Sequence, residues 1–488
     1  MDNPTPAVRP GALVGVLAFT GIVAALMQTL VIPLIAQLPF LLDTTVSNAS
    51  WVITITLLAG AVAMPVTGRL GDLYGKRPVM LACTVPLIVG SAICATATAL
   101  FPMLLGRGLQ GLGMGLIPLG ISVLRDVLPP EKLHSSIALM SSSMGIGGAL
   151  GLPVAAAVAE NANWRVLFWA ATILGAVVLV GIWRIVPATP VQGVRGKFDP
   201  IGAITLGIAL VCLLLAVSKG ADWGWSSGVV LGMFAAAIVA TGVFAWWELR
   251  VADPLIDLRV TARRPVLLTN LASIVVGFAM YAQSLIVPQL LQLPESTGYG
   301  LGQSMLAMGL WMAPSGIMMM LVSPLGARLS AGRGPKMTLL VGSLVIALGY
   351  GSSVLLMGST WGLLIVTSIC GVGIGLAYGA MPALIMGSVP QTATAAANSF
   401  NSLMRSIGTS ASAAVVGVVL AQMSMQVGGH TLPTEAGFRT GLLIGCGVAL
   451  VAALITLGIP GKPLGATLQR VDANGAGVGD RVVEVAKA

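Results

Sequence analysis

The chain has 488 residues, of which 56% are hydrophobic and 8% are charged, whereas charged residues make up about 25% of an ordinary globular protein. A soluble protein of this length needs far more charge to cover its surface, so the composition indicates that much of the surface faces lipid. The net charge of +9 at pH 7 is also informative, but only once the basic residues are placed along the chain.

Apolar stretches of about 20 residues, long enough to cross a bilayer as helices, recur along most of the chain. The first of them is not followed by a small-residue cleavage site, so it is not a secretory signal peptide. In chain order the pattern predicts fourteen helices, at 11–35, 51–68, 78–98, 102–124, 136–158, 165–186, 200–218, 228–247, 265–291, 302–325, 337–357, 361–386, 396–421 and 438–459.

The basic residues orient these helices. If the N-terminus is cytoplasmic, twenty of the 25 Lys and Arg residues fall on cytoplasmic segments, and only Arg165, Lys219 and Arg439 fall outside. This asymmetry follows the positive-inside rule and supports an even number of spans. We therefore expect a multi-pass protein of the cytoplasmic (inner) cell membrane with both termini in the cytoplasm, whose positive charge reflects topology and not nucleic-acid binding.

Six spans precede an extra pair of spans and six follow it. We expect a cytoplasmic N-terminus at 1–10, an N-terminal six-helix half at 11–186, a linker with the extra hairpin at 187–264, a C-terminal half at 265–459 and a disordered cytoplasmic tail at 460–488. The tail is rich in Gly, Ala and charge, a composition that does not form a core. The extra hairpin is expected at the periphery.

A glycine-rich basic segment at 68–77, GRLGDLYGKR, lies in the loop expected between spans 2 and 3. A degenerate copy at 326–336, GARLSAGRGPK, follows the second span of the other half. Internal duplication of this kind is common in secondary transporters.

Further segments fit one known family. Residues 107–111 read RGLQG, residues 147–153 read GGALGLP, and Asn163-Trp164-Arg165 precedes span 6. With the 68–77 segment, the sequence resembles the major facilitator superfamily over about residues 11–460, in particular its fourteen-spanner drug/proton antiporter branch. Three of these segments resemble its motif A (68–77), motif B (107–111) and, with one extra leucine before Pro153, its antiporter motif C (147–153). The resemblance implies an all-α fold of two six-helix halves plus the extra hairpin.

The motif A residues Gly68, Asp72, Gly75, Lys76 and Arg77 are gating candidates. Glycines suit a tight turn with close packing and positive φ, and Asp72 can accept hydrogen bonds from helix N-termini or pair with a basic residue. The resemblance implies that this loop latches the two halves together in one conformation. The alternative is a solvated turn that only fixes topology.

Arg107 lies within an apolar span, where a charge needs compensation. Gln110 falls on the same helical face, and the resemblance gives Arg107 a part in proton coupling. The alternative is a structural arginine paired with backbone carbonyls. Glu160, at the outer end of span 5, is the nearest approach of any acidic residue to mid-membrane.

Gly147, Gly151 and Pro153 make span 5 thin and kinkable, because small residues permit close helix contact and proline removes a backbone hydrogen bond. The resemblance implies that this helix seals or bends during export, and plain helix packing is the alternative.

Polar residues elsewhere mark the expected substrate cavity. Asn398, Asn401 and Arg405 share one face of span 13, which must look inward because it would be unpaired against lipid. The alternative to a substrate-lining or coupling role is a purely structural helix–helix network. In span 1 Gln28 stands where many relatives carry an aspartate. Because no acid lies securely in mid-membrane, we expect a neutral, zwitterionic or weakly acidic hydrophobic substrate.

We predict a monomeric exporter of hydrophobic small molecules such as drugs or antibiotics, driven by the proton gradient and lacking any cofactor. No catalytic or metal-ligating constellation is present in the sequence: the five cysteines lie in apolar runs and the two histidines in different loops. Two alternatives stay open, a uniporter or importer of a small metabolite and, more remotely, a non-transporting membrane sensor or enzyme.

Overall fold

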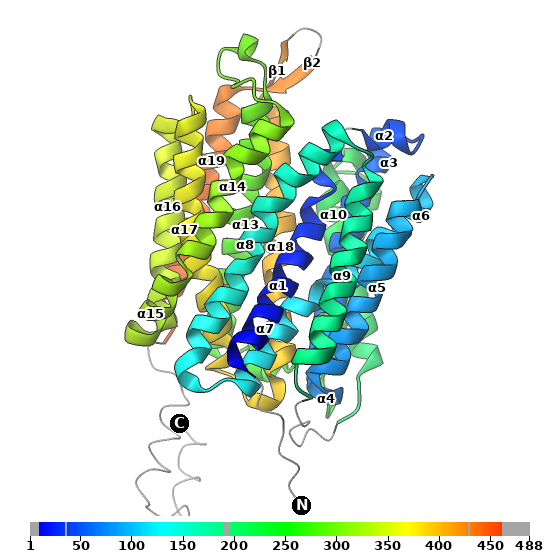
Figure 1. Cartoon of the computed structure of the whole chain (residues 1–488), viewed down its shortest axis with the longest axis vertical. Coiled ribbons are helices and arrows are strands. Elements are labelled where there is room, and N and C mark those ends of the chain that lie inside the picture. The colour runs from blue at the N-terminus through cyan, green and yellow to red at the C-terminus, as the bar shows by residue number, and fades with distance from the viewer. Residues whose placement is uncertain (1–8, 35–36, 189–195, 428–429, 461–488) are drawn as a thin grey trace, which may run out of the picture.

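The computed structural model describes residues 9–34, 37–188, 196–427 and 430–460. Within these ranges fourteen helices are long and apolar enough to cross a membrane, which confirms the expected number. They run side by side along the long axis of the molecule (Figure 1). Most of the expected N-terminal segment and the expected disordered tail, at 1–8 and 461–488, lie outside the described residues.

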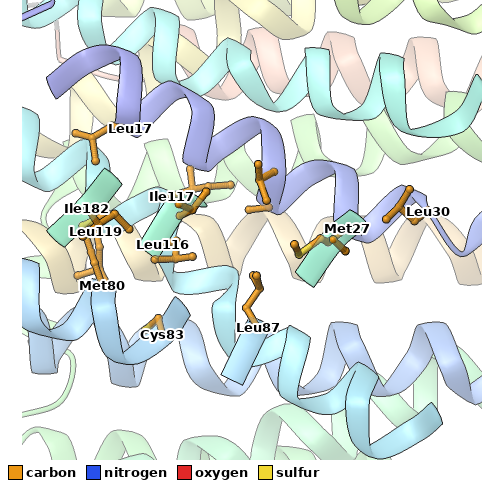
Figure 2. Close-up of a cluster of buried hydrophobic side chains, with 14 of the residues drawn as sticks. Leu17, Met27, Leu30, Met80, Cys83, Leu87, Leu116, Ile117, Leu119 and Ile182 are labelled. Atoms are coloured by element: carbon orange, nitrogen blue, oxygen red, sulfur yellow. The ribbon is translucent and has the colours of Figure 1, made fainter. Parts of the chain in front are cut away.

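The N-terminal half contains six spans that enclose their own apolar core, part of which is shown in Figure 2. Leu17, Met80 and Leu119 are fully buried there and come from three different spans. The elements are α1 (Pro10–Thr29), η1 (Ile32–Leu34), α2 (Leu38–Leu41), α3 (Val46–Ala49), α4 (Trp51–Tyr74), α5 (Lys76–Thr96), α6 (Leu100–Leu112), η2 (Gly113–Gly115), α7 (Leu116–Val127), α8 (Pro130–Asn161) and α9 (Arg165–Ile185).

The C-terminal half has a second, separate core. Its elements are α12 (Leu258–Thr261), α13 (Arg264–Gln292), η3 (Glu295–Thr297), α14 (Met305–Leu321), α15 (Ser323–Arg333), α16 (Pro335–Leu356), α17 (Thr360–Met386), η4 (Gln391–Ala393), α18 (Thr394–Gln422) and α19 (Glu435–Leu457). A short antiparallel hairpin, which the hydropathy pattern does not predict, joins α18 to α19. It pairs β1 (Ser424–Val427) with β2 (His430–Pro433), and Ser424 lies opposite Pro433.

The two ends of the helix bundle are distinguishable. We call the end at which α1 begins and α19 ends the terminal face, and the end that carries β1 and β2 the hairpin face (Figure 1). Because the number of spans is even, the first and last helices start and finish on the same side.

The halves meet along two seams, where α4 packs against α18 and α8 packs against α14. Both seams depend on glycines. A Cβ on Gly68 would lie 2.8 Å from the Ala395 carbonyl oxygen, and a Cβ on Gly316 would lie 2.1 Å from the Gly145 carbonyl oxygen. Helix backbones therefore approach each other more closely at these points than any side chain would allow.

The extra hairpin consists of α10 (Pro200–Trp223) and α11 (Gly228–Glu248). It was expected at the periphery, but only α11 is outermost: α10 packs against both α4 and α18. Leu206 and Leu210 of α10 share an apolar cluster with Leu403 of α18. The polar contact of α10 goes to the N-terminal half, where Lys219 Nζ lies 2.5 Å from Ser50 Oγ. The hairpin thus covers the α4–α18 seam because its leucines have apolar partners on both sides of it.

Candidate functional site at the seams between the halves

Motif A is mostly helical, which corrects the loop expected at 68–77. Residues 68–74 form the last two turns of α4, and α5 begins at Lys76. The turn between the helices is Gly75 alone, with φ 95° and ψ 143°. This backbone conformation is open to glycine but strained for other residues. Gly68 serves close packing, so Gly68 and Gly75 meet different demands.

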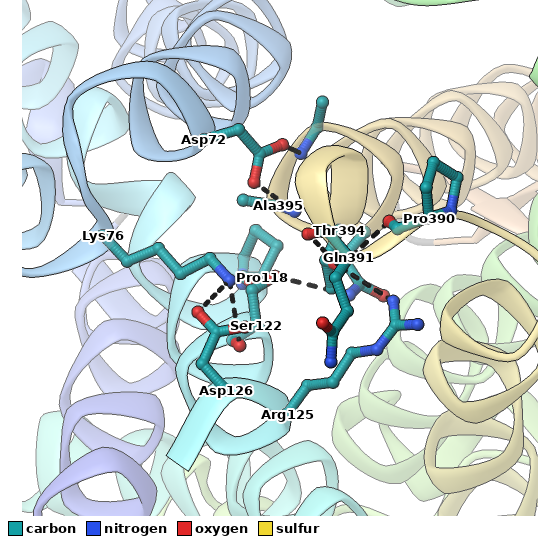
Figure 3. Close-up of polar contacts among 12 residues, drawn as sticks. Asp72, Lys76, Pro118, Ser122, Arg125, Asp126, Pro390, Gln391, Thr394 and Ala395 are labelled. Atoms are coloured by element: carbon teal, nitrogen blue, oxygen red, sulfur yellow. Dashed lines mark hydrogen bonds and ion pairs between the residues drawn. The ribbon is translucent and has the colours of Figure 1, made fainter. Parts of the chain in front are cut away.

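Asp72 crosses the seam. Its Oδ1 accepts a hydrogen bond from Ala395 N at 3.0 Å, and its Oδ2 accepts one from Ala396 N at 2.8 Å (Figure 3). These amides belong to the first turn of α18, whose unsatisfied N–H groups and dipole favour a negative charge. Asp72 is 7% exposed. The carboxylate of one half therefore caps a helix of the other half.

Two charged residues at the end of α7, Arg125 and Asp126, belong to the same group of contacts. We call the polar contacts made by Asp72, Lys76, Arg125 and Asp126 the latch. Lys76 forms an ion pair with Asp126, and its Nζ also donates to Ser122 O at 3.2 Å. Arg125 Nη1 donates across the seam to Thr394 Oγ1 at 2.8 Å (Figure 3). Arg125 and Asp126 were not among the predicted gating residues, although two adjacent charges at the end of an apolar span are a usable signal.

Arg77 acts within its own half. Its Nη2 donates to the carbonyl oxygen of Trp183, in the last turn of α9. A cation at the C-terminal end of a helix satisfies a free carbonyl and complements the helix dipole. Arg77 therefore ties the turn to α9 and does not reach the seam.

Arg107 is 2% exposed and is compensated by neutral oxygens from three helices. Its Nη1 donates to Met27 O at 3.0 Å and to Gln110 Oε1 at 2.7 Å, and its Nε donates to Val52 O at 3.2 Å. Gln110 Nε2 in turn donates to Ser91 Oγ at 2.8 Å. The guanidinium is thus held by α1 and α4 as well as by its own helix.

The structure does not bring the other two N-terminal candidates to Arg107. Glu160 is exposed near the hairpin-face end of α8 and takes part in none of the ion pairs formed within the described ranges. Gln28 is partly buried on α1, one residue after the carbonyl of Met27 that accepts from Arg107.

Helix α8 of the N-terminal half borders the C-terminal half and continues unbroken through Pro153. Gly147 and Gly151 face α1: a Cβ on Gly147 would lie 2.4 Å from Ile22 O, and one on Gly151 would lie 1.9 Å from Thr29 Oγ1. Pro153 faces the other side, since a Cβ on Gly309 of α14 would lie 2.9 Å from the Pro153 backbone. The motif C-like residues therefore let α8 pack closely on α1 and on α14.

The polar face of α18 extends inward from the latch. Asn398 Nδ2 lies 3.4 Å from Ser122 Oγ across the seam. Asn401 Nδ2 donates to Asn270 Oδ1 of α13 at 2.9 Å, and Arg405 Nη1 donates to Asn401 Oδ1 at 3.0 Å. The expectation that this face looks into the bundle is met, because all three predicted residues are buried.

Comparison with known proteins agrees with this architecture. Residues 17–413 match the family described as Major Facilitator Superfamily. An uncharacterized MFS-type transporter of Mycobacterium tuberculosis is 30% identical over 67% of this chain. The match covers 46% of that relative, so the chain spans less than half of its length.

Other relatives carry names that state a function. The multidrug transporter protein MdtP of Bacillus subtilis is 26% identical, with 77% of this chain and 69% of the relative covered. The tetracenomycin C resistance and export protein of Streptomyces glaucescens is 27% identical, with 78% and 70% covered. Among solved structures, the human organic anion transporter MFSD10 superposes with a TM-score of 0.64 at 16% identity, over 93% of this chain and 100% of that one. That likeness concerns the fold alone.

Proposed function

This chain belongs to the Major Facilitator Superfamily, and from that premise we propose that it exports hydrophobic small molecules in exchange for protons. It works by alternating access across the cytoplasmic membrane, with the terminal face in the cytoplasm. The multidrug and antibiotic exporters among its relatives support the direction and the substrate class. No bound cofactor is needed, because the proton gradient supplies the energy.

The observation that carries the proposal is the latch at the terminal face. Asp72 and Arg125 of one half bond to the start of α18 in the other half. Alternating access requires that such contacts form in one state and break in the next, so that a substrate site between the halves opens to one side at a time. A carboxylate on a helix N-terminus suits this purpose, because water can replace it when the halves separate.

Proton coupling is assigned to Arg107 with Gln110, and to Glu160. The Arg107 guanidinium is held only by neutral oxygens, so its positive charge is not compensated by an acidic residue. A proton or an anion that arrives nearby therefore changes the electrostatic energy of this arginine. Glu160 lies at the hairpin face, which is the outer side in this proposal, and it is exposed there.

Everted membrane vesicles that contain the protein test the proposal. We expect them to accumulate the neutral dye N-phenylnaphthylamine when an inward-acidic proton gradient is imposed, and to stop when a protonophore collapses it. Vesicles carrying Arg107→Ala at equal protein abundance should accumulate the dye only at the background rate. Accumulation that persists after the gradient collapses would exclude antiport and favour a uniporter. An intact host that holds less substrate after deletion of the gene would indicate an importer.

A further inference from the structure

Arg405 is a buried charge without a counter-charge. It lies in the middle third of α18 and is 7% exposed. Within the described ranges no ion pair includes it. Its Nη1 donates to Asn401 Oδ1 at 3.0 Å and its Nη2 donates to Ser402 Oγ at 2.8 Å. Both acceptors are neutral, and both belong to the same helix as Arg405.

The other buried arginine of the bundle is satisfied differently. Arg107 is held by two backbone carbonyls, from α1 and α4, together with Gln110. Backbone carbonyls of two neighbouring helices fix that guanidinium in place. A guanidinium carries five N–H groups, and the partners of Arg405 are the Asn401 and Ser402 side chains of its own helix and the Tyr378 side chain of α17. Arg405 is therefore held by side chains, whereas Arg107 is held mainly by backbone carbonyls, and two of the five N–H groups of Arg405 stay available to a ligand.

The surroundings of Arg405 are rich in donors and include an aromatic ring. The Arg405 guanidinium carbon lies 4.9 Å from the centre of the Tyr378 ring of α17. Asn270 Nδ2 on α13 is buried and has no hydrogen-bond partner, although Asn270 Oδ1 accepts from Asn401. Three helices thus contribute a cation, a free amide donor and an aromatic face to one cluster.

The network also holds the guanidinium in one orientation. Asn401 donates both to Asn270 Oδ1 at 2.9 Å and to Ser273 Oγ at 2.7 Å, so its own oxygen is directed toward Arg405. A positioned guanidinium next to a second donor suits a planar, two-oxygen anion, to which arginine can donate two parallel hydrogen bonds. An aromatic ring alongside suits the apolar part of the same molecule.

We propose that Arg405, Asn270 and Tyr378 form a binding site for the carboxylate of an aromatic or otherwise apolar organic acid. The proposal rests on the exporter function above and narrows its substrate class. The substrate then supplies the negative charge that the protein itself lacks in mid-membrane. Bound anion and guanidinium neutralise each other, which lowers the cost of holding both charges away from water.

Fluorescence titration of the purified full chain with two matched probes tests this site. Pyrenebutyrate carries a carboxylate, and pyrenebutyramide is its neutral counterpart of nearly equal size. We expect the wild-type protein to bind the carboxylate about tenfold or more tightly than the amide, as a charge-assisted hydrogen-bonded pair does. Arg405→Gln should abolish this preference and leave binding of the amide unchanged, whereas Arg405→Lys should keep part of it.

Two further variants separate binding from structure. Asn270→Leu removes the unpaired donor and should weaken the carboxylate preference while Arg405 stays in place. Arg439→Gln, which alters an exposed arginine paired with Glu435, should change nothing. The proposal is overturned if Arg405→Gln keeps the preference, or if Arg405→Gln and Asn270→Leu weaken both probes equally. The titration needs no proton gradient. The binding result can therefore be interpreted even if gradient-driven export is not observed.

Discussion

Two turns at the terminal face occupy corresponding places in the two halves. Gly75 joins α4 to α5 with φ 95° and ψ 143°, and Gly334 joins α15 to α16 with φ 87° and ψ 154°. Each is a single residue between two helices, in a backbone conformation that glycine adopts readily. The duplicated sequence segments therefore produce the same turn twice.

The basic residue two positions after each glycine also has the same role. Arg77 donates to a carbonyl oxygen near the end of α9, the last helix of its half. Lys336 donates to Leu457 O, at the end of α19, at 2.9 Å. Both cations therefore bind the C-terminal end of the sixth span in their own half.

The turns differ three residues before the glycine. Asp72 caps α18 of the opposite half, whereas the corresponding residue of the other turn is Ala331, which has no polar side chain. The duplicated turn is thus a structural unit, and the cross-seam latch is an addition to one copy. This difference can be tested with substitutions in the N-terminal turn alone and with matched substitutions in both turns.

The largest effect is expected from the ion pair that only the N-terminal turn possesses. The Lys76 and Asp126 side chains are 6% and 11% exposed, and breaking a buried pair leaves one charge uncompensated, at a cost of about 3–5 kcal/mol. Lys76→Met should therefore lower the midpoint of thermal unfolding in detergent strongly. The double variant Lys76→Met/Asp126→Leu should recover most of the loss. If the single and double variants unfold alike, the pair does not stabilise the turn.

The second-largest effect is expected from the substitution Asp72→Asn. The neutral amide keeps the size of the side chain but loses two charge-assisted hydrogen bonds to α18, and we expect transport in everted vesicles to fall about tenfold or more. Protein abundance should stay normal. Asp257→Asn is the matched control, because the Asp257 carboxylate likewise caps a helix but accepts from Arg259 N and Val260 N of α12, the short helix that directly follows it. Undiminished transport by Asp72→Asn at normal abundance would contradict the latch.

Replacing the turn glycines should affect both halves similarly. Gly75→Ala and Gly334→Ala each place a Cβ in a strained backbone region and should cost about 1–3 kcal/mol of stability. Gly148→Ala is the control, because a Cβ there meets no atom within 4 Å. We expect the stability losses to match, and only Gly75→Ala to reduce transport further, since it alone disturbs the helix end that carries Asp72. Equal transport by the two variants would remove the functional distinction between the turns.

The smallest effect is expected from the two cations. Arg77→Gln and Lys336→Gln each remove a charge from the C-terminal end of a helix, which is worth about 0.3–1 kcal/mol. The two losses should be similar, measured as shifts in thermal unfolding midpoint, and neither should alter the proton dependence of transport. A large transport defect in Arg77→Gln alone would place Arg77 in the latch itself.

Much of the fold was predictable because hydropathy, charge and glycine patterns act locally. The fourteen spans were confirmed, and the repeated segment marked the position of the corresponding turn in each half. The helical state of residues 68–74 was missed, because glycines at Gly68 and Gly71 suggest a loop unless a neighbouring helix is known to pack on them. The seam position of α10 was missed for the same reason.

Several residues of the candidate site could be predicted from the sequence, but the residues that they contact could not. Asp72 was expected to accept from helix N-termini, yet only the structure identifies Ala395 and Ala396 as the donors, more than 300 positions away in the chain. Arg125 and Asp126 were overlooked because charges at a span end are usually attributed to topology. Their roles depend on which helices lie beside them.

The sequence by itself determined that this protein has fourteen helices long and apolar enough to cross a membrane. It also determined how the basic residues are distributed and where the duplicated turns lie, because each of these follows from the chemistry of neighbouring residues. Only the tertiary structure decided that Asp72 joins the two halves, that α10 covers a seam and that Arg405 is left without a counter-charge. Hydrogen bonds and charge compensation in a membrane interior depend on which helices meet, and no local pattern encodes that.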